Sequence, residues 1–380
     1  MTNAVATTES GRADSAARTG PTIGLVSHPA VLRANPYQRL LYRELARHGV
    51  VLAAEAPFDL GWLRRARKSI RVLHFHWPQA YWRHERGSRF LRRPLSYVKV
   101  VLFAFRLRAA RALGYRIVWT VHQVYPHERS AGRLDRLGAR ALARYSDLLL
   151  VHDRATAASM AAELGRHAEK RAIVPHGSYE GVYPPGRARD VVRGELGLPP
   201  DAFAFLSFGD LRVYKGVSLA LDAVAATTAP GIRLVVTGGT EDEAQAEAVR
   251  AAAVRDTRIV EHLGFVPDER VAELFGACDA ALVSRSDGGT SGSLILALSL
   301  GLPVAAARRP AYEDLLGGEE AGWLFDPGDA DSLTHTLERA ASADSDTLEA
   351  KRAAARRRVD DLGWDEIGMR TAALIREAVA

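Results

Sequence analysis

Short apolar runs rich in β-branched residues recur along the chain, and amphipathic segments with helical periodicity separate them. Such runs are typical of strands buried on both faces, which occur in parallel sheets covered by helices. Their alternation with helices predicts an α/β fold built on parallel sheets. The predicted strands are Thr22–Val26, Val72–Phe75, Arg116–Val121, Asp147–Val151, Ala172–Val174, Phe203–Phe208, Arg233–Thr237, Ile259–Leu263, Ala280–Val283 and Pro303–Ala306.

The length of 380 residues exceeds what one hydrophobic core normally serves, so we expect two domains. The stretch 181–200 breaks the alternation with repeated Gly and Pro, and we interpret it as a linker after an N-terminal domain over 21–180. Residues 1–20 are rich in Ala, Thr, Ser and Gly without an apolar block, which predicts a disordered leader. A single cysteine, Cys278, excludes a disulfide within the chain and is typical of a reducing compartment.

Positive charge is concentrated in one segment. Residues 61–116 hold fifteen Lys or Arg and one acid, a net charge of +14, whereas the whole chain has +6 and the remainder therefore has −8. This asymmetry favours an acidic partner: nucleic acid, an anionic membrane surface or an anionic substrate. An arginine-rich surface that only meets solvent explains it equally well.

The residues that follow the predicted strands differ between the two halves of the chain. Histidines follow the strands of the first half, and small residues follow those of the second half. Ligands of open parallel sheets bind outside the carboxyl ends of the strands. We therefore predict two half-sites, with hydrogen-bonding imidazoles in one domain and room for a nucleotide in the other. The histidines are His28, His76, His122, His152 and His176.

Two loops of the second half have the features of a diphosphate site. The segment 284–307 places Gly, Ser and Thr between a strand and a helix, and a helix N-terminus with glycines before it attracts anions. In the segment 208–216, Arg212 and Lys215 lie between a strand and a helix. Arg binds phosphate bidentately and Lys acts as a point charge. We predict that both cations hold a diphosphate, together with Gly289, Thr290, Ser291, Gly292 and Ser293.

Motifs at 209–216, 263–269 and 300–306 resemble, in this order, those of GT-B glycosyltransferases of family 4, also called group 1. The segments 321–329 and 362–365 fit the same family. The resemblance implies two Rossmann-like domains facing across a cleft. The second would span 201–361, and a C-terminal helix over 362–380 would cross back onto the first domain.

The same resemblance implies a cytoplasmic hexosyltransferase that uses a nucleotide sugar and neither a cofactor nor a metal. Its acceptor would be a glycan, a lipid-linked sugar or a small molecule, in polysaccharide, glycolipid or natural-product glycoside biosynthesis. Nucleic acid is not an expected partner. A sugar-nucleotide epimerase and an inactive nucleotide-sugar-binding relative are the alternatives. Few acids follow the strands, which argues against the epimerase.

One departure from the family lies in the glycine-rich loop. Family 4 usually carries two glutamates eight residues apart, and Gly288 and Leu296 stand at these positions. Asp287 lies one residue before the first and is a candidate contact for the donor sugar. The chain therefore resembles a divergent branch, for which a retaining reaction is only the default expectation.

The remaining site predictions combine the residues with the resemblance. His122 would orient the donor sugar, and Glu128 would be the base of an inverting reaction. A backbone-satisfied histidine and a helix-capping glutamate are the plain alternatives. Gly238, Phe265 and Val266 would contact the donor sugar or base. The acceptor side would comprise Asn35, His76, Trp77 and His176. His74 and His76 share a strand face, but no third metal ligand has a clear spacing.

The segment 83–111 mixes arginines with large apolar residues. Cationic stems around an apolar face suit an anionic membrane interface. The segment is a candidate for peripheral contact with the inner membrane face, and a packing helix of the first domain is the alternative.

Overall fold

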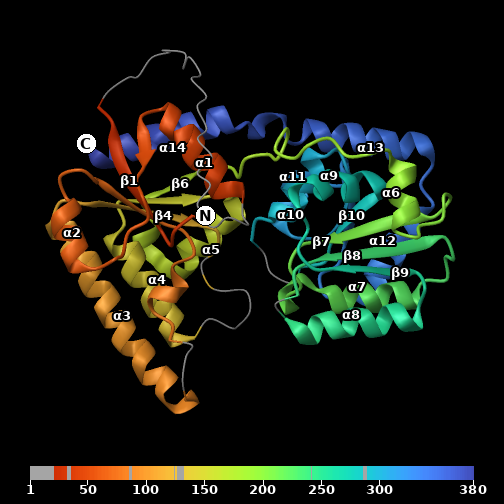
Figure 1. Cartoon of the computed structure of the whole chain (residues 1–380), viewed down its shortest axis with the longest axis horizontal. Helices are drawn as coiled ribbons and strands as arrows, with labels where there is room; N and C mark the ends of the chain where they lie inside the picture. The colour runs from red at the N-terminus through yellow and green to blue at the C-terminus, as the bar shows by residue number, and fades with distance from the viewer. Residues whose placement is uncertain are drawn as a thin grey trace, which may run out of the picture.

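The computed structural model describes residues 21–31, 36–84, 88–123, 125, 132–240, 242–285 and 289–380. The predicted leader, 1–20, lies outside this part of the chain. The described residues form two α/β domains side by side (Figure 1), which confirms the predicted fold class.

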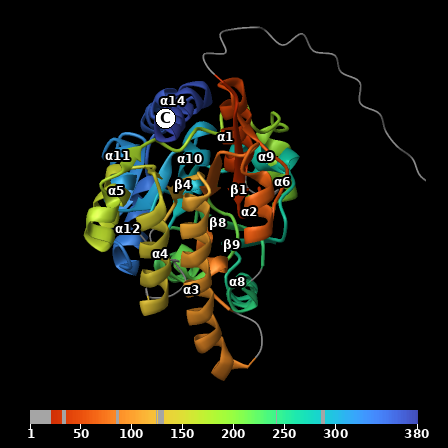
Figure 2. The ribbon, with the colours of Figure 1, turned by 90° about the vertical axis from the view of Figure 1, so that its left-hand side faces the viewer.

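The N-terminal domain is built on a parallel six-stranded sheet in the order β2-β1-β3-β4-β5-β6. Its strands are β1 (Ile23–His28), β2 (Val50–Leu52), β3 (Val72–Phe75), β4 (Arg116–Val121), β5 (Leu148–Val151) and β6 (Arg171–Ile173). Its helices are α1 (Pro36–Arg47), α2 (Leu60–Ala66), α3 (Arg89–Ala112), α4 (Arg133–Tyr145) and α5 (Arg154–Leu164). Figure 2 shows α3 and α4 projecting together from this domain.

The C-terminal domain repeats this plan with the order β12-β11-β10-β7-β8-β9. Its strands are β7 (Phe203–Phe208), β8 (Ile232–Gly238), β9 (Ile259–Leu263), β10 (Ala280–Val283), β11 (Val304–Ala307) and β12 (Gly322–Phe325). Its helices are α7 (Val217–Ala226), α8 (Glu243–Arg255), α9 (Asp268–Ala277), α10 (Gly292–Ser299), α11 (Pro310–Leu316), α12 (Ala330–Ala341) and α13 (Ser345–Arg357).

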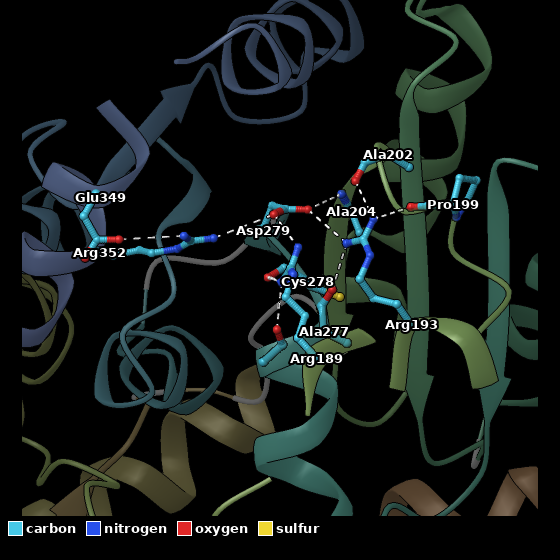
Figure 3. A network of polar contacts seen from close by, with 11 residues as sticks. Arg189, Arg193, Pro199, Ala202, Ala204, Ala277, Cys278, Asp279, Glu349 and Arg352 are labelled. Atoms are coloured by element: carbon cyan, nitrogen blue, oxygen red, sulfur yellow. Dashed lines mark hydrogen bonds and ion pairs between the residues drawn. The ribbon is translucent and has the colours of Figure 1, made fainter. Parts of the chain in front are cut away.

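The predicted linker contains a helix, α6 (Arg189–Glu195), that is fixed to the second domain by the carboxylate of Asp279. This carboxylate accepts a hydrogen bond from the backbone N–H of Ala204 (2.9 Å). It also accepts from the guanidinium groups of Arg189 (2.6 Å) and Arg193 (3.4 Å), and Arg352 of α13 lies 3.7 Å away (Figure 3). Three arginines around one buried carboxylate join α6, β7, β10 and α13.

The last helix, α14 (Trp364–Val379), crosses back and packs on α1, as predicted (Figure 1). Trp364 fixes the crossing, because its indole N–H donates to the carbonyl of Ser178 at 2.6 Å. Gly177 lies under the indole, where a Cβ would come within 2.3 Å of the ring. The backbone before the linker is therefore shaped to fit this tryptophan.

Candidate functional site

The carboxyl ends of β7 and β10 carry the two loops predicted to hold a diphosphate. The strand order reverses between these neighbours, because β8 and β9 follow on one side and β11 and β12 on the other. Ligands bind in the crevice at such a reversal. The Ser284 hydroxyl joins the loops by donating to the carbonyl oxygens of Lys215 (2.9 Å) and Gly216 (3.0 Å), as alternative acceptors.

Lys215 and Ser293 meet above the backbone of Gly209, which follows β7. Gly209 has φ +107°, and a Cβ there would lie 2.5 Å from Lys215 Nζ and 3.7 Å from Ser293 Oγ. Glycine is therefore needed for the conformation, whereas the Lys215 side chain could move to make room for a Cβ. Arg212 is half-buried in the same loop, directly before the short 3-10 helix Val213–Lys215. The Ser293 hydroxyl donates to the carbonyl of Phe208 at 3.3 Å, so the ammonium of Lys215 is the group of this loop that suits an anion.

The other predicted hydroxyls have different surroundings. Ser291 is buried and is the N-cap of α10, where its Oγ accepts from the N–H of Leu294 at 3.3 Å. The Thr290 hydroxyl donates to the carboxylate of Asp153 in the other domain. Gly289 and Gly292 are half-buried in this loop. The hydroxyl beside Lys215 is thus that of Ser293, and the diphosphate roles of the other loop residues stay predictions.

Three predicted site residues lie outside the described part of the chain: Asn35, Glu128 and Asp287. Leu296 is described and is buried in α10, within the core that both domains share. An apolar side chain therefore occupies the position where the family usually has its second glutamate.

The predicted contacts for the sugar and base surround the end of β8. Gly238 has φ +139°, and a Cβ there would lie 2.3 Å from the carbonyl carbon of Gly209. The two strand ends therefore touch through their backbones. Phe265 is 81% exposed, and Val266 is half-buried. The exposed ring of Phe265 fits the predicted base contact, which stays a prediction.

Histidines line the carboxyl edge of the N-terminal sheet. His76, His122, His152 and His176 follow β3, β4, β5 and β6. Neighbouring strands lie about 4.8 Å apart, and the ring centroids of successive histidines lie 5.4, 5.0 and 5.4 Å apart. The spacing of the strands thus produces a continuous row of imidazoles.

Burial keeps these imidazoles neutral. Desolvation lowers the pKa of His176 to about 3 and also lowers the pKa of His152. The pKa values of His76 and His122 are held well below the ordinary value, first by burial and then by neighbouring histidines. Among the described residues, no three His, Cys, Asp or Glu side chains are grouped to hold a metal ion.

His122 is the half-buried member of this row. The indole of Trp77 stacks on its ring, with centroids 4.3 Å apart and an interplanar angle of 10°. Tyr37 of α1 meets the same ring edge-on at 5.0 Å. The structure thus brings together His76, Trp77, His122 and His176, which the sequence predicts for the donor sugar and the acceptor.

Sequence reasoning places Tyr37 on the acceptor side but missed Tyr42 and the carboxylate of Asp153. Tyr37 and Tyr42 lie on α1, and Tyr42 contacts His74 and His76. Asp153 caps α5 by accepting from the N–H of Thr156 at 2.6 Å, and it also meets Thr290. Asp153 has the local signature of an N-cap, whereas the tyrosine contacts depend on how α1 docks on the sheet.

The sequence of the chain is similar to those of known glycosyltransferases. Residues 188–358 match the family described as glycosyl transferases group 1. The GDP-mannose:glycolipid 4-beta-D-mannosyltransferase of Xanthomonas campestris pv. campestris is 29% identical over 254 residues, 67% of this chain and 66% of that protein. The match thus spans slightly less than two thirds of that relative's length. The 2-deoxystreptamine glucosyltransferase of Streptomyces kanamyceticus is 27% identical over 67% of this chain and 69% of its own.

Anabaena HepE in complex with UDP-glucose has a similar structure, with a TM-score of 0.72 and 16% identity over 93% of this chain and 99% of that one. The two sheets and this likeness show that the chain has the fold of the GT-B glycosyltransferases. Residues 188–358, in the C-terminal half of the chain, are similar to the group 1 glycosyltransferases.

Proposed function

We propose that the protein transfers a hexose from a nucleotide-sugar donor, held by the C-terminal domain, to an acceptor hydroxyl at the N-terminal domain. One observation carries this proposal: Lys215 Nζ and Ser293 Oγ converge over Gly209 where the sheet order reverses. The names of the similar proteins include GDP-mannose and UDP-glucose, and both molecules are nucleotide sugars.

The reaction breaks the bond between the sugar and the diphosphate, so negative charge grows on the leaving diphosphate. Donors fixed in advance toward such charge usually supply the largest part of catalysis. Lys215 supplies a positive charge in the predicted site, and Arg212 lies three residues before it in the same loop. We propose that these cations serve in place of a metal ion and that no cofactor takes part. In support, the nitrogens of His74 and His76 already contact Tyr42, Thr120 and His122.

The acceptor is proposed to lie against the histidine row, with His122 and Trp77 at the cleft. Neutral imidazoles and an aromatic face suit sugar hydroxyls and sugar faces. We place the reaction in the cytoplasm, which agrees with the lone cysteine: Cys278 is buried, and burial raises the pKa of its thiol to about 12.

We also propose that α3 attaches the protein to an anionic membrane that holds a glycolipid acceptor. One face of α3 packs into the domain through Val100, Phe103 and Leu107. The opposite face exposes Leu91, Leu95, Val98, Val101, Leu102 and Phe105. The segment that contains α3 has a charge of +14, and such a basic amphipathic surface suits anionic lipid headgroups. In the described part of the chain, no helix has the length and apolarity to span a bilayer.

Vesicle sedimentation tests the attachment. The protein should sediment with vesicles that contain anionic lipid and remain in the supernatant with purely zwitterionic ones. Val101→Asp should abolish sedimentation, because it places a charge on the exposed face, where Val101 is 68% exposed. Val254→Asp, at an 87% exposed position of α8, is the matched control and should sediment normally. Equal sedimentation of both variants would refute the attachment.

A donor panel tests the transfer itself. The protein is incubated with UDP-, GDP- and TDP-sugars, with glycolipid acceptors, with free aminocyclitols and without an acceptor. We expect slow hydrolysis of one donor alone and transfer to one acceptor class. Lys215→Ala should abolish transfer without a change in the melting temperature, whereas Lys68→Ala, at an exposed lysine, should leave the rate unchanged. Transfer by Lys215→Ala at near the wild-type rate would refute the site assignment, and absence of turnover with every donor would refute the function.

A further inference from the structure

The histidine row belongs to a longer chain of hydrogen bonds that links four strands and α1. His74 Nε2 lies 2.8 Å from Thr120 Oγ1, and Tyr42 OH lies 3.1 Å from His74 Nδ1 and 2.8 Å from His76 Nε2. His76 Nδ1 lies 3.1 Å from His122 Nε2. His122 Nδ1 lies 3.2 Å from His152 Nε2, and His152 Nδ1 lies 3.1 Å from the carbonyl oxygen of Val174. We call this chain, from Thr120 to Val174, the imidazole relay.

The carbonyl of Val174 determines the direction of the relay. A carbonyl only accepts hydrogen bonds, so His152 Nδ1 carries a proton. In a neutral ring the other nitrogen is then an acceptor, so His152 Nε2 accepts from His122 Nδ1. The same rule makes His122 Nε2 the acceptor of a bond from His76 Nδ1.

The same rule fixes the donors and acceptors on the other side of His76, away from Val174, through the hydroxyl of Tyr42. His76 Nε2 accepts from the Tyr42 hydroxyl, and the Tyr42 oxygen accepts from His74 Nδ1. His74 Nε2 accepts from the hydroxyl of Thr120. Every bond therefore has one donor and one acceptor only when His74, His76, His122 and His152 all carry their proton on Nδ1.

Neutrality is the second condition, and the surroundings meet it. Burial lowers the pKa values of all four rings. A protonated imidazole donates from both nitrogens. Within the relay, one of its N–H groups would then face the N–H or O–H donor of the preceding member, and that hydrogen bond would be lost. The relay also ends at a carbonyl, which takes up no proton. The arrangement thus fixes protons in place and does not conduct them.

We propose that the imidazole relay is a positioning device that holds His122 in one neutral tautomer, with His152 and the Val174 carbonyl as its anchor. This inference rests on the proposed function for its purpose. Both ring nitrogens of His122 are used within the relay, so His122 would present a fixed, uncharged ring to the sugar, and charge neutralisation is left to Lys215 and Arg212. His152 acts through His122 and is a positioning residue.

The direction of the relay makes the effects of its members unequal. Tyr42→Phe removes one hydroxyl upstream of His122, and the anchor at His152 remains. His122 should then keep its proton on Nδ1, whereas His74 should become a mixture of tautomers. His152→Ala removes the anchor, so His122 should become a mixture of tautomers. Tyr115→Phe is the matched control, because the Tyr115 hydroxyl is also buried but donates to the carbonyl of Leu63, outside the relay.

The test is ¹⁵N NMR of histidine-labelled protein at pH 7.5, with signals assigned from His74→Gln and His122→Gln. In the wild type, His122 should show a protonated Nδ1 and a lone pair on Nε2. An Nε2-protonated or doubly protonated His122 in the wild type would overturn the proposal, whether or not the variants fold. If His122 were a mixture of tautomers in Tyr42→Phe but kept a single tautomer in His152→Ala, the assigned direction would be wrong.

A kinetic measurement completes the test. His152→Ala should lower kcat about 10- to 100-fold, the range typical of residues that orient a metal-binding histidine, with a smaller change in KM. Tyr115→Phe should match the wild type. Normal transfer with a mixed His122 tautomer would refute the inference alone. Absence of transfer with a fixed wild-type tautomer would refute the proposed function alone.

Discussion

Acidification from pH 7.5 to 5.5 should destabilise the protein strongly, because several buried histidines are neutral in the fold. Burial lowers the pKa of His28 to about 4 and those of His74 and His176 to about 3, from an ordinary value of 6.5. As the pH falls through 6.5, the unfolded chain binds protons that the folded chain does not. This contribution to stability is therefore complete above pH 6.5 and is lost progressively toward pH 3 to 4.

The magnitude follows from these pKa values. One pH unit below 6.5 costs about 1.4 kcal/mol for each histidine that stays neutral in the fold. At pH 5.5 the three histidines together cost about 4 kcal/mol. His76, His122 and His152 shift in the same direction and add to this loss. A typical domain has about 5–15 kcal/mol of stability, so the loss is large.

Urea unfolding, followed by tryptophan fluorescence at several pH values, measures this loss. The free energy of unfolding should fall by at least about 4 kcal/mol between pH 7.5 and 5.5. His28 is a suitable probe, since its Nε2 is buried without a hydrogen-bond partner and its ring lies among Phe58, Phe75 and Tyr81. His28→Leu should reduce the loss by about 1 kcal/mol. A fall below about 1 kcal/mol in the wild type would refute the reasoning.

Two further substitutions test how α14 and α6 are fixed to the domains on which they pack. Gly177→Ala should lower the free energy of unfolding by about 1–3 kcal/mol, because its Cβ would lie 2.3 Å from the Trp364 ring. Gly194→Ala, where nothing lies within 4 Å, should be neutral or stabilising, and equal effects would contradict the role of Trp364. Arg193→Met should cost about 3–5 kcal/mol in urea unfolding, since it leaves Asp279 buried with fewer partners. A loss under about 1 kcal/mol would show that the other arginines suffice.

The sequence predicted ten strands, and all ten are present, with ends shifted by up to two residues. It missed β2 and β12, which lie at the edges of the two sheets. β2 has three residues and β12 has four, but β6 and β10 are as short and were predicted, so length does not explain these two omissions. Local patterns were enough to predict that the sheets are parallel. The pairing of an edge strand depends on a neighbour that is distant in sequence, which a local pattern does not contain.

The candidate diphosphate site could be predicted from the sequence because its two cations lie in one loop. The segment 208–216 displays Arg212 and Lys215 directly, and the sheet reversal agrees with their predicted place. The imidazole relay was only partly visible. The histidines at the strand ends could be listed from the sequence, but their direction depends on the Val174 carbonyl and on Tyr42, which α1 brings from elsewhere in the chain.

The central claim, a nucleotide-sugar site at Lys215, is tested most directly by thermal unfolding with UDP, GDP, TDP and their sugars. A ligand that binds only the folded state stabilises it by about 3 kcal/mol at 100 times its Kd. One nucleotide should raise the melting temperature of the wild type by several degrees and leave that of Lys215→Ala unchanged. An equal rise in both proteins, or no rise with any nucleotide, would contradict the account.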